Sequence, residues 1–105
     1  MNTIQSRTQS YAGLHLEENH GMTMTGRSVR DAWVFGILPE GDGFAGKTAG
    51  DMQYLFEQVH KAWEPYGHLP SRLPPVLAAR HSRIHDEAIQ RAKAAGWSAE
   101  LRDDD

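Results

Sequence analysis

A glycine-rich segment matches a residue pattern that has a defined chemistry. Residues 41–48 satisfy the G-x-x-x-x-G-K-[ST] pattern of phosphate-binding loops. In such a loop, backbone N–H groups hold phosphates and a hydroxyl binds Mg²⁺. We favour a glycine turn ending in a helix cap, because no later strand ending in aspartate supplies a second Mg²⁺ ligand. In the phosphate-binding alternative, the binding residues are Gly41, Gly46, Lys47 and Thr48.

A second candidate is the pair His81 and His85, which lie one helical turn apart. Two imidazoles at this spacing can bind a metal ion from one face of a helix. A catalytic zinc site needs at least a third protein ligand, and the remaining histidines and acids stand at no diagnostic spacing. Metal binding is therefore an alternative, beside a packed His81 and an exposed His85. We expect no bound cofactor.

Charge and aromatic residues favour a protein partner. The chain has a net charge of −3, so we do not expect it to bind nucleic acid. Basic residues concentrate in 65–93, whereas acidic residues dominate 31–64. Aromatic and arginine side chains are frequent anchors of protein interfaces. The residues predicted to contact another protein, or a second copy of the chain, are Trp33, Tyr66, Arg72, Arg80, Arg83 and Trp97.

Residues 32–38 are the most strand-like segment of the chain. They read Ala-Trp-Val-Phe-Gly-Ile-Leu, are rich in aromatic and branched side chains, and stop at Pro39. The pattern predicts a short β-strand, either paired with residues 22–29 in a hairpin or alone.

Two amphipathic helices follow in the sequence. The first is predicted to begin at a capping box formed by Thr48 and Asp51, and to end before Pro65. The second is predicted to start near Pro75 and to end at Gly96. A proline-rich strap over 66–75 joins them into an antiparallel hairpin. Its predicted shared core is Phe56, Val59, Trp63, Leu77 and Ile84.

These elements predict an α+β fold. We divide the chain into a flexible N-terminal arm at 1–30, a single compact domain at 31–101 and an acidic tail at 102–105. The apolar residues of 1–30 are scattered, which is why this segment is assigned as an arm.

Composition narrows the function. The chain contains no cysteine, which excludes a thiolate zinc site and a cysteine nucleophile. No nucleophile elbow or spaced carboxylate pair is present, so we predict no catalytic residues and no enzymatic activity. No segment has the pattern of a signal peptide or a membrane span, so we expect a cytoplasmic protein. We predict a small non-enzymatic protein-binding module, acting as an accessory subunit, regulator or inhibitor of a larger assembly.

Overall fold

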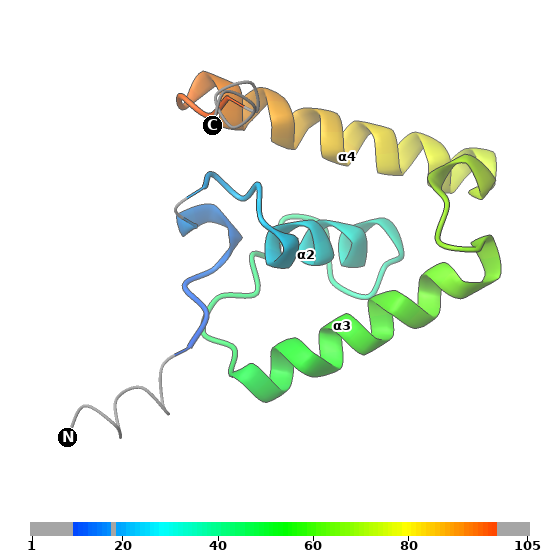
Figure 1. Ribbon diagram of the computed structural model, residues 1–105, viewed down its shortest axis with the longest axis horizontal. Coiled ribbons are helices and arrows are strands. Elements are labelled where there is room, and N and C mark those ends of the chain that lie inside the picture. The colour runs from blue at the N-terminus through cyan, green and yellow to red at the C-terminus, as the bar shows by residue number, and fades with distance from the viewer. Residues whose placement is uncertain (1–9, 18, 99–105) are drawn as a thin grey trace, which may run out of the picture.

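The regular secondary structure of the described part of the chain consists of helices alone. A computed structural model describes residues 10–17 and 19–98 (Figure 1). Within them the α-helices are α2 (Met24–Val34), α3 (Ala49–Trp63) and α4 (Pro75–Ala94). Three short 3-10 helices, η1 (Leu14–Leu16), η2 (Glu64–Tyr66) and η3 (Pro70–Arg72), lie in the connections. No strand occurs among the described residues, so the predicted α+β fold with a β-hairpin or lone strand is wrong.

The segment predicted as a strand is the end of α2 and the turn that follows it. The Thr23 hydroxyl caps the start of α2 by accepting a hydrogen bond from the backbone N–H of Gly26, at 2.9 Å. The end is a Schellman motif, in which Ile37 N donates to Ala32 O at 2.9 Å and Gly36 N donates to Trp33 O at 3.3 Å. Gly36 takes the left-handed conformation that this motif requires, with φ 74°.

Helix α2 lies between α3 and α4, as Figure 1 shows. It packs against both of them and is buried over most of its surface. Because both long helices place their apolar stripes toward α2, the predicted core of only two helices is replaced by a core of three. The buried core residues of the three helices are Val29, Ala32, Trp33, Val34, Leu55, Val59, Trp63, Ile84, Ala88 and Ala92.

The predicted core residues have different outcomes. Val59, Trp63 and Ile84 are buried. Leu77 is half-buried and packs against the same cluster. The prediction for Phe56 is wrong, because its exposed fraction is 36% and it does not belong to the hydrophobic core cluster.

The ends of the two long helices follow the sequence signals. Thr48 and Asp51 form the predicted capping box at the start of α3. Pro75 is in the first turn of α4. At the other end of α4, Gly96 has φ 109° and Trp97 N donates to Ala92 O at 2.9 Å, which completes a second Schellman motif.

The folded unit includes residues assigned to the N-terminal arm. Leu14 is buried in the core, and Tyr11 is hydrogen-bonded through its backbone to Gly46 and Lys47. Together with α2, these contacts place the start of the packed structure well before residue 31. Residues 1–9 of the predicted arm, and the acidic tail at 102–105, lie outside the described residues. Among the helices described, none combines the length and the apolar character needed to cross a membrane.

Candidate metal centre

Three side chains from two helices converge where α2 meets α4. Asp31 is in the last turns of α2, and His81 and His85 are one turn apart on α4. Because α2 lies between the long helices, the carboxylate of Asp31 also contacts Trp63 at the end of α3. The pair of histidines predicted from the sequence therefore gains a third ligand-type side chain, Asp31, which the sequence had not indicated.

The ligand atoms of this cluster are close together. One atom each of Asp31, His81 and His85 lies within 4.8 Å of the others. His85 Nε2 and Asp31 Oδ1 are 2.9 Å apart. Two ligand atoms about 2.1 Å from one ion, at an angle of about 90–110°, are about 3.0–3.4 Å apart. Shifts of at most about 1.4–1.8 Å would therefore bring all three atoms to metal-ligand spacing.

A hydrogen bond fixes the carboxylate of Asp31. The indole Nε1–H of Trp63 donates to Asp31 Oδ2 at 3.1 Å, while Oδ1 faces His85. The two oxygens thus have different partners, and the rotation of the carboxylate is restricted. Partners of this kind, which orient a ligand without touching the ion, are usual around protein metal sites.

Electrostatics favours a neutral imidazole at His81. Burial lowers the pKa of His81 from its usual value, and the neighbouring His85 lowers it further, while Asp31 opposes the shift. The ring of His81 also packs edge-on against Trp63, with ring centroids 5.8 Å apart. Since only the neutral form of histidine binds a metal, this environment keeps His81 available as a ligand at neutral pH.

The cluster is open to a cavity of about 540 Å³. Its polar lining includes Arg27 and His68 in addition to the three ligand-type residues. The imidazoles of His68 and His60 stack with centroids 4.5 Å apart at the η2–η3 side of the molecule. An ion held by three protein ligands would therefore keep coordination positions that face the cavity.

The same contacts connect the three helices. Asp31 on α2 bonds to Trp63 on α3 and to His85 on α4. A buried carboxylate requires such partners whether or not an ion is present. The cluster is therefore a structural cross-link as well as a candidate ligand set.

The glycine-rich loop has structural contacts that account for its residues. Thr48 N and its hydroxyl both donate to the carboxylate of Asp51, so an acidic group already occupies the start of α3. Gly41 and Gly46 have left-handed φ values of 95° and 79°. Lys47 lies over the ring of Phe44. No parallel sheet, on which such phosphate loops are built, occurs among the described residues.

The residues predicted to bind a protein partner differ in burial and in their contacts within the chain. Trp33 is buried and donates through Nε1 to Asp42 O, and Tyr66 stacks on Phe35. Two arginines are engaged within the chain: Arg83 pairs with Glu40 and Glu87, and Arg80 donates to Val34 O. Arg72 is exposed, and Trp97 is half-buried beside a different cavity. The protein-binding function stays a prediction.

No protein-family model, no curated protein and no solved structure matches the chain.

Proposed function

We propose that the protein binds a divalent transition-metal ion through Asp31, His81 and His85. The observation that carries the proposal is the convergence of two imidazoles and one carboxylate within 4.8 Å at the wall of a cavity. Two histidines and one carboxylate form a recurrent ligand set for zinc and for non-haem iron. We propose binding of the ion alone, and no reaction.

The surroundings of the cluster support this assignment. The carboxylate is held by Trp63, as a ligand is held by its neighbours in known metal sites. Burial lowers the pKa of His81, which favours its neutral, metal-binding form. The chain contains no cysteine, so its candidate ligands are nitrogen and oxygen atoms. Such a ligand set suits zinc, iron, cobalt or nickel, and the geometry of the site and the supply of each metal decide which ion binds.

Calorimetric titration with Zn²⁺ and the absorption spectrum of a Co²⁺ complex test the proposal. We expect one ion per chain, with the intensity of the Co²⁺ bands reporting four- or five-fold coordination. The variants His81→Ala and Asp31→Asn should weaken Zn²⁺ binding at least tenfold, or about 1.4 kcal/mol, since second-sphere changes alone cost 10- to 100-fold.

The matched control is His60→Ala, which removes an exposed imidazole on α3 outside the cluster. It should bind Zn²⁺ as the parent does. Circular dichroism of each variant establishes that it is folded. A parent chain that binds no stoichiometric ion refutes the proposal, as does a folded His81→Ala variant with unchanged affinity.

A further inference from the structure

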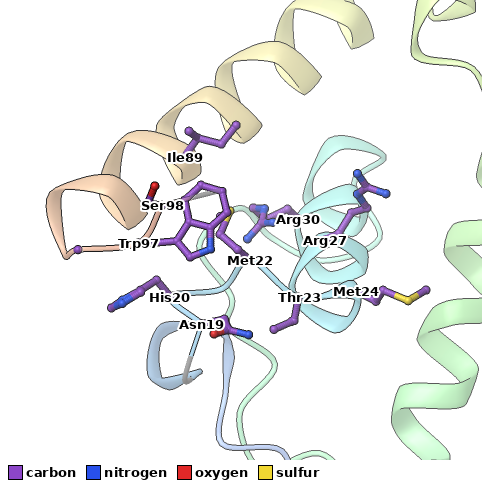
Figure 2. Close-up of a pocket in the computed structure, with 11 residues that line it drawn as sticks. Asn19, His20, Met22, Thr23, Met24, Arg27, Arg30, Ile89, Trp97 and Ser98 are labelled. Carbon is purple, nitrogen blue, oxygen red and sulfur yellow. The ribbon is translucent and has the colours of Figure 1, made fainter. Parts of the chain in front are cut away.

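A second cavity, of about 950 Å³, lies between the start of α2 and the end of α4. In the view of Figure 2, Trp97, Met22 and Arg30 lie close together between the two helices, while Arg27 and Met24 extend from α2 on the side away from Trp97. Two arginines, Arg27 and Arg30, contribute to the lining, and no carboxylate does so among the described residues. The charge of this cavity is therefore positive.

Arg30 is the unusual member of the lining. Its exposed fraction is 5%, and Nη1 donates to Gly21 O at 2.7 Å. Nε is the buried side-chain nitrogen that has no hydrogen-bond partner among the described residues. No described carboxylate lies within salt-bridge distance of Arg30, although burial of an arginine is normally accompanied by pairing.

Burial is the main electrostatic cost of this charge. It lowers the pKa of Arg30; Asp31 and Glu17 oppose the shift without forming a salt bridge to Arg30, and the charge of Arg27 adds to it. An arginine side chain nevertheless stays protonated at neutral pH. Two like charges at one cavity, one of them almost fully buried, favour an anionic ligand over a neutral or cationic one.

The rest of the cavity wall is mixed, with apolar side chains beside the polar Asn19, His20, Thr23 and Ser98. Trp97, Met22 and Ile89 all line it, and the three are labelled in Figure 2. Trp97 is held in place by the Schellman motif at the end of α4, through its N–H to Ala92 O. An aromatic ring beside two guanidinium groups suits a ligand that has both an apolar body and an anionic group.

We propose that this cavity binds a small organic anion, with its carboxylate or phosphate at Arg27 and Arg30 and its apolar body against Trp97. The site is separate from the three metal-ligand residues, none of which lines it, although Arg27 and Ile89 line both cavities. The proposal does not depend on a bound metal ion.

Titration by two-dimensional NMR of the full chain, with the indole N–H of Trp97 as the reporter, tests the proposal. The probes are phenylacetate and phenyl phosphate, with neutral phenylacetamide as the matched control for charge. We expect one or both anions to shift the Trp97 resonance saturably. Phenylacetamide should bind at least tenfold more weakly.

Variants then test the residues. Arg27→Gln should weaken binding of the anion at least tenfold, because Arg27 is exposed and its loss leaves the fold intact. Arg72→Gln is the matched control, since Arg72 is an exposed arginine outside the cavity. It should change nothing. Trp97→Ala, followed through other resonances, should weaken both anions. Arg30→Gln and Arg30→Lys are compared once circular dichroism shows that both are folded. The Lys variant keeps the positive charge, so it should bind the anion more tightly than the Gln variant.

Several outcomes would overturn the inference. They are the absence of a saturable shift with either anion at millimolar concentration, equal binding of phenylacetamide, and equal weakening by Arg27→Gln and Arg72→Gln. His81→Ala separates this site from the metal centre. Anion binding that survives in His81→Ala while Zn²⁺ binding is lost establishes two independent sites, whereas loss of both refutes their separation.

Discussion

Trp63 joins the packing of the core to the candidate metal centre, and its substitution tests both. The side chain is 8% exposed and packs edge-on against Phe35, with ring centroids 5.1 Å apart. Its indole N–H donates to Asp31 Oδ2. Trp63→Ala removes the packing and the hydrogen bond together, whereas Trp63→Phe removes mainly the hydrogen bond.

The expected magnitudes follow from these contacts. Truncating a buried tryptophan to alanine costs about 3–5 kcal/mol. Leaving a buried carboxylate oxygen unpaired costs about 1–3 kcal/mol, which is the expectation for Trp63→Phe. A domain of this size is stable by about 5–15 kcal/mol, so Trp63→Ala should remove a large part of the stability, and nearly all of it at the lower end of this range. Phe56→Ala is the control on the same helix.

The control has its own expected value. Burial of a whole phenylalanine side chain stabilises a protein by about 1.5–3 kcal/mol. Phe56 is 36% exposed, so about two-thirds of that gain, roughly 1–2 kcal/mol, is at stake. Phe56→Ala should therefore be clearly less costly than Trp63→Ala.

Urea unfolding followed by far-ultraviolet circular dichroism, in the presence of EDTA, measures these differences. The denaturant slope should be the same in all variants, because each unfolds the same surface. A Phe56→Ala variant as unstable as Trp63→Ala would show that α3 buries the face that carries Phe56, contrary to the structure. A Trp63→Phe variant as stable as the parent would refute the bond to Asp31 as a contribution to stability.

Two further predictions concern a backbone turn and a titration. Gly36→Ala should destabilise the fold by about 1 kcal/mol in urea unfolding. A Cβ at this position meets no neighbour, so the cost comes from the backbone, which has φ 74°. Unchanged stability would contradict the left-handed turn at Gly36. The metal-free protein should lose stability as the pH falls below about 6.5. In that range His81 takes up a proton in the unfolded chain, but its lowered pKa means that it takes up less in the folded chain, so acid favours the unfolded state. His81→Gln should flatten this pH dependence and His60→Gln should not; equal slopes in the parent and His81→Gln would count against a buried, neutral His81.

The two long helices could be predicted because each carries an apolar stripe and clear end signals. Thr48 with Asp51 marks the start of α3, and Pro75 and Gly96 mark the limits of α4. A helix that is covered on one side shows the 3.6-residue period that these signals accompany. Sequence reasoning works best for such half-covered helices.

The end of helix α2 resembles a strand in sequence because it is covered by both long helices. Ala32, Trp33 and Val34 are all buried, and with the residues up to Leu38 they form an apolar run without helical periodicity. The signals that identify it are local. Thr23 caps its start, and Gly36 stands where a Schellman motif ends a helix.

The candidate metal centre could be predicted only in part. The spacing of His81 and His85 places both on one helix face whatever else the chain does. Asp31 joins them only because α2 is a helix and lies between α3 and α4. The approach of Asp31 to the two histidines depends on tertiary packing, and it cannot be predicted when residues 32–38 are assigned to a strand.

Adjacent charged residues on the buried helix connect the two proposed sites. Arg30 and Asp31 are 5% and 7% exposed, in a helix whose other buried residues are apolar or glycine. Successive residues on a helix point in different directions, so the two charges do not face each other as a pair. Arg30 lines the cavity beside Trp97, while Asp31 faces His85 and the other cavity. Burying two charges apart from one another costs more than burying apolar side chains in their place. Replacing these two charged residues by apolar ones would stabilise a small core. Buried charges that lower stability in this way are concentrated at functional sites. The most buried helix of the protein therefore supplies one buried charged residue to each proposed site, and the exposed Arg27 in addition to the anion site.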